Sequence, residues 1–171
     1  MKEAGLDVKI DKVGNIFGIK QGTDPDKRSV MVGSHVDSVL NGGMFDGPLG
    51  VMSAIEAVRR INDEGYEHER NIEVVVYTSE EGSAFPVGLL GSSVLIGDIS
   101  VEEALKTENE DGETLEETLE KIGYKGDYEK NLSDIEYALE MHVEQGPVLE
   151  NKEIPVGIVE NITGITWVLS T

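Results

Sequence analysis

Six residues of this chain have the side chains and the spacing that metal-assisted hydrolysis requires. They are His35, Asp37, Asp46, Glu80, Glu81 and His142. Imidazole and carboxylate groups bind divalent metals, and a carboxylate that stays off the metal can take a proton from water. The chain has no cysteine, so any metal must be held by histidine, aspartate and glutamate. This set therefore predicts a metal site that activates water.

The histidines have carboxylates at a spacing that suits metal binding. In an extended segment His35 and Asp37 project to the same side, and the Asp37 carboxylate can accept the ring N–H of a metal-bound imidazole and fix its tautomer. His142 is flanked in the same way by Glu140 and Glu144. A lone histidine is more often a surface or core residue, but these neighbours favour a metal ligand at both positions.

The other carboxylates lie at bends, where local sequence leaves two interpretations open. Asp46 lies in the glycine-rich stretch 41–50 before a predicted helix, where it could bridge two metals about 3.5–4 Å apart or simply form a turn or helix cap. Glu80 and Glu81 end an apolar segment just before Gly82, so both could reach one site, one as ligand and one as proton acceptor. On a surface loop the same pair would be ordinary solvated acids.

Alternating β and α patterns must position these residues. We predict strands at 8–10, 15–20, 30–32, 72–77 and 137–143, and helices at 50–62 and 89–96. This order predicts an α/β fold class, a layered sheet with flanking helices. Ligands of open α/β sheets bind at the carboxyl ends of the strands, which is where the histidines and glutamates lie.

Charge and length limit the partners of the chain. The 171 residues suit one domain, and 34 acidic against 14 basic residues give a formal net charge of -20. Such a chain would be repelled by a phosphate backbone, so we expect no nucleic acid partner. The acid-rich stretch 101–134 is interpreted as solvated helical faces, because Ser100 with Glu103 and Thr114 with Glu117 form capping boxes.

The chain shows no apolar run near the ~20 residues that a membrane helix needs. Its start lacks a basic stretch followed by an apolar one, so no signal peptide is predicted. We therefore expect no membrane partner and a cytoplasmic location.

Four segments, taken together and in order, resemble a known family of hydrolases. They are GSHVDSV (33–39), GGMFDGPLGV (42–51), EEGS (80–83) and HVEQGPVLE (142–150). The chain resembles the metal-dependent amidohydrolases that include N-carbamoyl-L-amino acid hydrolases, allantoate amidohydrolases and β-ureidopropionases, a branch of the M20-type peptidases. The resemblance implies a phosphorylase/zinc-peptidase-like catalytic domain.

The resemblance also implies a two-metal site, with zinc, manganese, cobalt or nickel as the divalent ions. His35, Asp46 and His142 are expected to bind one metal, and Asp46 and Glu81 to bind the other. In this family the second metal also takes a histidine near the end of a chain more than twice this long, and no such residue exists in this sequence. We therefore expect two metals in the complete enzyme, and one or none in this chain.

Further roles follow from the same resemblance. Glu80 is expected to be the general base, and Asp37 to orient His35. Met44 and Ala84 stand where the family commonly has arginine, so the substrate-binding residues of this chain stay unknown.

The resemblance implies a division of the chain. Residues 1–160 would be a partial metallopeptidase-like catalytic domain, and 161–171 the start of a truncated lid and dimerisation insertion. The strand-like segments 156–159 and 164–169 resemble the entry into that insertion. We therefore expect a fragment or truncated gene product, without the lid domain that makes the complete enzyme a homodimer.

The activity implied for the complete enzyme is hydrolysis of a linear carbamoyl or ureido C–N bond in a small molecule such as an N-carbamoyl-L-amino acid. Two alternatives stay open. One is an aminoacylase or dipeptidase of the same superfamily, and the other is an inactive, truncated metal-binding module.

Overall fold

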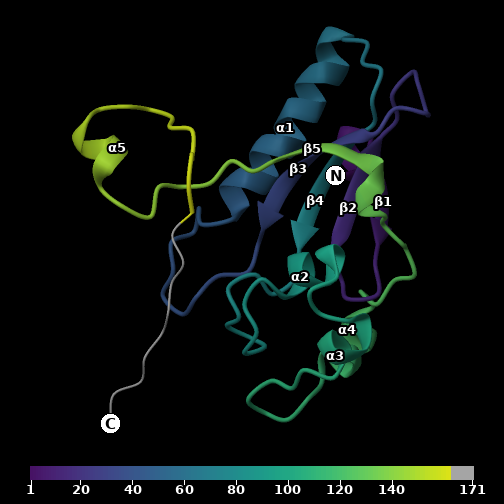
Figure 1. Cartoon of the computed structure of the whole chain (residues 1–171), viewed down its shortest axis with the longest axis vertical. Coiled ribbons are helices and arrows are strands. Elements are labelled where there is room, and N and C mark those ends of the chain that lie inside the picture. Colours follow the sequence, from purple (N-terminus) through teal and green to yellow (C-terminus); the bar gives the residue numbers. More distant parts are fainter. Residues whose placement is uncertain (163–171) are drawn as a thin grey trace.

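A computed structural model describes residues 1–162 (Figure 1). The strands are β1 (Asp7–Ile10), β2 (Ile16–Lys20), β3 (Ser29–His35), β4 (Ile72–Tyr77) and β5 (Ile135–Leu139). The α-helices are α1 (Pro48–Glu64), α2 (Leu90–Ile96), α3 (Val101–Leu105), α4 (Leu115–Ile122) and α5 (Val148–Asn151). Two short 3-10 helices, η1 (Lys2–Ala4) and η2 (Leu132–Asp134), complete the described elements.

The strands form one five-stranded mixed sheet in the order β1-β2-β4-β3-β5. β3 runs parallel to both of its neighbours, β4 and β5, whereas β2 pairs antiparallel with β1 and with β4. The carboxyl ends of β4, β3 and β5 therefore lie side by side at one edge of the sheet. The predicted α/β layered fold is confirmed.

Apolar clusters hold helices against the sheet. Ala54 and Val58 of α1 pack with Val74 of β4 on one face. Phe17 of β2 and Val75 of β4 face the other way, in a cluster that Leu95 of α2 joins. Figure 1 shows α1 along the sheet, with α3 and α4 next to each other below it. The central strand β4 is therefore buried on both faces, as its apolar sequence predicts.

Both predicted capping boxes are confirmed. The side chain of Ser100 accepts the Glu103 N–H at 3.2 Å at the start of α3, and Thr114 accepts the Glu117 N–H at 3.2 Å at the start of α4. In α4, Leu115 and Leu119 are buried, whereas Ile122 in the last turn of the helix is 57% exposed.

Two strands differ in length from their predictions. β3 continues to His35 instead of ending at residue 32, because it stays paired with β4 up to Tyr77. β5 ends at Leu139 instead of 143, because the chain beyond it crosses the start of α1, where the Met141 carbonyl packs against Gly50. His142 therefore lies after the strand, not within it.

The end of the described chain also differs from its prediction. Residues 156–159 form no strand in the part that the structure describes. The second strand-like segment, 164–169, lies outside the described residues. Within residues 1–162, no helix has the length and apolar character that crossing a membrane requires.

Replacing Phe17 by alanine should lower the free energy of unfolding by about 3–5 kcal/mol, because its side chain is 0% exposed and would leave a cavity. The ring centroid of Phe17 lies 5.4 Å from that of Tyr128, so an aromatic contact is lost as well. Urea unfolding followed by circular dichroism measures the change. Tyr66, 65% exposed, is the control, and its change to alanine should cost under about 0.5 kcal/mol. Equal losses would contradict this core.

Candidate metal centre

Four separate segments bring the predicted site residues to one edge of the sheet. His35 is the last residue of β3, and Glu80 and Glu81 lie in the loop that follows β4. Asp46 precedes α1 by two residues, and His142 follows the end of β5 by three. The parallel pairing of β3 with β4 and β5 is what places these segments together, although they span a hundred residues of sequence.

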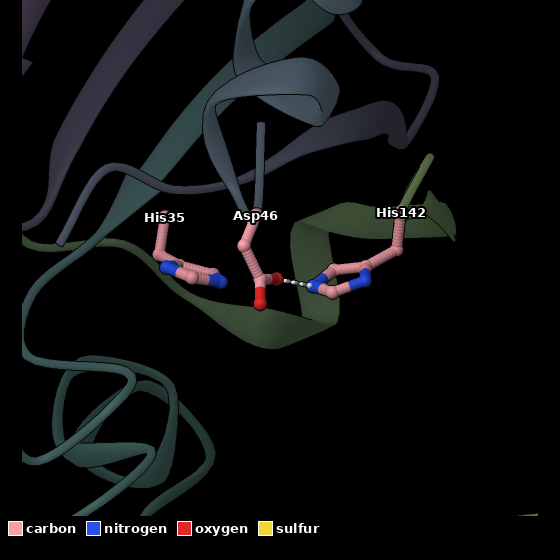
Figure 2. Close-up of side chains that lie close together, drawn as sticks. All are labelled: His35, Asp46 and His142. Atoms are coloured by element: carbon pink, nitrogen blue, oxygen red, sulfur yellow. Dashed lines mark ion pairs between the residues drawn. The ribbon is translucent and has the colours of Figure 1, made fainter. Parts of the chain in front are cut away.

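The potential ligand atoms form two groups that share His35. One ligand atom each of His35, Asp46 and His142 lie within 4.8 Å of one another, and so do those of His35, Glu80 and Glu81. Figure 2 shows the Asp46 carboxylate between the two imidazole rings, whose centroids are 5.9 Å apart. His142 Nε2 lies 3.1 Å from Asp46 Oδ1. These residues could hold a metal ion through histidine and carboxylate ligands.

Both rings present the same nitrogen to this site. His35 Nδ1 lies 2.9 Å from the carbonyl oxygen of Asp37, and His142 Nδ1 lies 2.9 Å from that of Val143. A carbonyl oxygen can only accept, so each Nδ1 carries a proton and donates it. In the neutral ring Nε2 then keeps its lone pair, which is the form that binds a metal.

Asp37 holds the site through different atoms from those predicted. Its backbone carbonyl, not its carboxylate, is the nearest partner of the His35 ring, since Oδ1 lies 3.5 Å from Nδ1. The carboxylate instead accepts the backbone N–H groups of Glu80 and Glu81 at 3.2 and 2.9 Å. Asp37 therefore ties the end of β3 to the loop after β4.

The carboxylates predicted to frame His142 have other partners. Glu140 accepts a hydrogen bond from the Ser34 hydroxyl, and Glu144 accepts the N–H of Val148 at 2.9 Å at the start of α5. The prediction that they flank the ring is wrong, because the strand alternation on which it rested ends at Leu139.

Asp46 has the free oxygen that a cation would need. Its Oδ1 is buried and has no hydrogen-bond partner within residues 1–162. Its Oδ2 accepts a hydrogen bond from Gln145 Nε2 at 2.8 Å. An unpaired buried carboxylate oxygen is costly, and it faces the lone pair of His142 Nε2, so a positive charge between these atoms would stabilise both. The residues therefore fit a divalent cation.

Burial raises the pKa of the Glu80 carboxyl above its ordinary value. The nearby His35, whose Nε2 lies 3.5 Å from Glu80 Oε2, lowers this pKa, while the negative charges of Glu81, Asp37 and Glu140 raise it. A carboxylate with a raised pKa is a better proton acceptor, which suits a general base.

Gly47 allows the Asp46 loop to pass close to His35. Its φ is +80°, and a Cβ at this position would lie 2.5 Å from His35 Nδ1 and Cε1. Any other residue would therefore be strained and would push against the ring.

Sequence reasoning gave no role to Gln145 or to Asn15. Gln145 contacts Asp46, and its position in the HVEQGPVLE segment next to His142 was the available signal. Asn15 was predicted as the first residue of a strand, but it lies just before β2 and its side chain turns inward. The local sequence marks the role of Asn15 only by its position in the turn that follows Asp11, two residues after Val13.

A protein-family model described as Peptidase family M20/M25/M40 matches residues 31–168, most of the chain. The chain belongs to this M20 family. The relatives of the chain belong to the amidohydrolase branch that its motifs indicate. It is 43% identical over 175 residues to an N-carbamoyl-L-amino acid amidohydrolase of Geobacillus stearothermophilus, and 35% identical over 166 residues to an allantoate amidohydrolase of Bacillus subtilis.

These matches cover the M20 chain almost completely and its relatives only in part. The two alignments span 100% and 96% of the chain, but 42% and 40% of the relatives. A crystal structure of a hydantoinase/carbamoylase family amidase from Burkholderia multivorans superposes with a TM-score of 0.86 and 43% identity, over 89% of this chain and 37% of that one. The resemblance seen in the motifs and the catalytic-domain fold are thus confirmed.

Replacing Gly47 by alanine should destabilise the M20 chain by at least about 1–2 kcal/mol, the cost of a left-handed conformation for a residue with a Cβ. Gly43, in the same loop, is the matched control, because a Cβ there meets nothing within 4 Å. Urea unfolding compares the two variants. Equal stabilities would show that the Asp46 loop is not held against His35.

Proposed function

We propose that this chain is the metal-binding part of an amidohydrolase that cleaves linear carbamoyl or ureido C–N bonds in small molecules such as N-carbamoyl-L-amino acids. The observation that carries the proposal is the convergence of Asp46, with its unpaired buried oxygen, on His35 and His142. The relatives support the substrate class, since their names are N-carbamoyl-L-amino acid amidohydrolase, allantoate amidohydrolase and, in Arabidopsis thaliana, ureidoglycolate hydrolase.

In this proposal, residues 1–160 belong to the catalytic domain and 161–171 lead toward a lid and dimerisation domain. The chain spans 42% of the length of its relative from Geobacillus stearothermophilus, so activity and dimer formation are proposed for the whole protein.

Two divalent metals, zinc or else manganese, cobalt or nickel, would be held by this chain's side chains. His35, Asp46 and His142, whose ligand atoms lie together, would hold one. Asp46 and Glu81 would hold the other, as the family resemblance implies, whereas among the described residues Glu81 groups with His35 and Glu80. Metals bound there would polarise the substrate carbonyl and lower the pKa of bound water toward ~7.

Glu80 would move the proton. It lies beside the ligands with a carboxyl pKa raised by burial, so it can take a proton from the attacking water and pass it to the leaving nitrogen. Asp37 would hold these residues in place. Its backbone carbonyl accepts the hydrogen bond of the His35 ring, and its carboxylate accepts the backbone N–H groups of Glu80 and Glu81.

Replacing His142 by alanine should weaken zinc or manganese binding by more than about 100-fold, since loss of residues that only support ligands already costs 10–100-fold. His68 is the matched control, a loop histidine whose Nδ1 faces the Arg70 carbonyl at 2.7 Å. Isothermal titration calorimetry measures affinity and stoichiometry. If both variants bind as the unchanged chain does, the site is not where we place it.

Metal stoichiometry separates the proposal from its non-catalytic alternative. Of the residues that the resemblance assigns to the second metal, this chain supplies Asp46 and Glu81, so the alternative is a module that binds one metal. Two bound metals per chain, measured by titration with zinc, would support an enzyme site. One or none would support the module.

Replacing Glu80 by glutamine should leave metal binding nearly unchanged and lower turnover by about 10²–10⁴-fold, because only the proton acceptor is removed. The assay uses the whole protein with N-carbamoyl amino acids, allantoate and dipeptides, and preference for dipeptides would support an aminoacylase or dipeptidase instead. Glu67, exposed in a loop, is the control for the substitution. Full turnover in Glu80→Gln would remove Glu80 from the reaction.

A further inference from the structure

The loop that carries Glu80 and Glu81 leaves β4 in an irregular conformation and yet has its backbone groups paired. Ser79 has a positive φ of 49°, and Gly82 follows with a φ of 67°. The carbonyls of Thr78, Ser79 and Glu80 accept the N–H groups of Gly91, Leu90 and Leu89 at 2.8, 3.2 and 2.7 Å. The shape of the loop is thus imposed by tertiary partners, not by a regular element.

One of these partners is a buried side chain that lies just before β2, the strand next to β4. Asn15, 0% exposed, accepts the Thr78 N–H with Oδ1 at 2.9 Å and donates from Nδ2 to the Gly91 carbonyl at 3.0 Å. Gly91 in turn donates its N–H to the Thr78 carbonyl at 2.8 Å. Asn15, Thr78 and Gly91 therefore close a ring of three hydrogen bonds, two residues before Glu80.

The ring needs an asparagine. An N–H can only donate and a carbonyl can only accept, so the side chain must offer one acceptor and one donor in fixed places. The second Nδ2 proton is also used, since it is donated to Asp11 Oδ2 at 2.8 Å. Asp11 further accepts the Asn15 backbone N–H at 2.8 Å, which holds the amide in place.

Gly91 shows how tightly this junction is packed. A Cβ on Gly91 would lie 2.1 Å from Asn15 Oδ1 and 2.6 Å from Thr78 N. Only a residue without a side chain allows the start of α2 to reach both groups.

We propose that Asn15 is a positioning residue for Glu80 and Glu81. Through its hydrogen bonds with Thr78 and Gly91, it fixes the point where the loop that carries both glutamates leaves β4. This inference rests on the proposed function for the meaning of those two carboxylates. Asn15 anchors the loop before Ser79 and Asp37 anchors it after, through the N–H groups of Glu80 and Glu81. His35, Asp46 and His142 lie on other segments, so Asn15 should act on one ligand group and not on the other.

The first test is amide hydrogen exchange by NMR in Asn15→Ala. We expect exchange at Thr78, Glu80 and Glu81 to accelerate by at least about tenfold relative to the rest of the sheet, because a buried partner is lost. The matched control is Asn71→Ala, since the Asn71 side chain accepts the Gly22 N–H at 2.9 Å just before β4, at the opposite edge. That control should accelerate Gly22 alone.

A purely structural role for Asn15 would give a different pattern. Uniform acceleration across the sheet, or acceleration at Thr78 without Glu80 and Glu81, would overturn the proposal. If Asn15→Ala does not fold, the unchanged chain decides: Thr78, Glu80, Glu81 and the Asn15 Nδ2 protons should share one opening equilibrium, whereas unprotected Glu80 and Glu81 amides beside a protected Thr78 would refute it.

The second test is zinc titration of the same variants. In Asn15→Ala, zinc binding at the site that His142→Ala removes should persist. The zinc affinity of the site that depends on Glu81 should fall by about tenfold, as expected for loss of a residue that supports a ligand. Equal weakening of both, or of neither, would contradict a positioning role. If the unchanged chain binds no zinc, the proposed function loses its metal site, and if it binds one zinc independently of Glu81, the titration reports only the His142 site. In both cases the exchange pattern alone decides whether Asn15 positions the loop.

Discussion

The parallel pairing of β3 with β4 on one side and with β5 on the other is the constraint on which the site depends. Parallel strands end at the same edge, so the chain that leaves each strand enters the same small volume. His35, opposite Tyr77 in the register, is the last paired residue and belongs to both groups of potential metal ligands. The antiparallel strands β1 and β2 extend the sheet and bring Asn15 to the end of β4.

Beyond the last paired residues, side chains replace the strand ladder as partners of the backbone. Asp37 and Asn15 have the same role, because the side chain of each accepts backbone N–H groups of the segment after β4. Buried backbone groups must be paired, so these two side chains limit the conformations open to Glu80 and Glu81.

The same edge gathers negative charge with few cations to balance it. Asp46, Glu80, Glu81 and Asp37 lie around two histidines, and one buried Asp46 oxygen has no hydrogen-bond partner in the described chain. Such a cluster is costly without a cation and favourable with one, which is the physical link between this fold and metal chemistry. Membership of the M20 family agrees with that link.

The sequence by itself determined the elements and the candidate ligands. The strand at 72–77 and the caps at Ser100 and Thr114 follow from local side-chain patterns, and they lie where predicted. The identity of the site residues followed from motif resemblance, and the structure brings them to one edge as the strand order requires.

Tertiary structure alone decided which atoms meet. The spacing of two residues suggested that the Asp37 carboxylate faces His35. In the structure this carboxylate accepts two backbone N–H groups from the loop after β4, and the Asp37 backbone carbonyl accepts the hydrogen bond of the His35 ring instead. Strand alternation placed His142 between two glutamates, but the strand ends first, at Leu139. The partners of Asn15 lie 63 and 76 residues away. The spacing of hydrophobic residues and the presence of helix-capping residues are local properties of a chain. The choice of a hydrogen-bond partner depends on groups that only folding brings together.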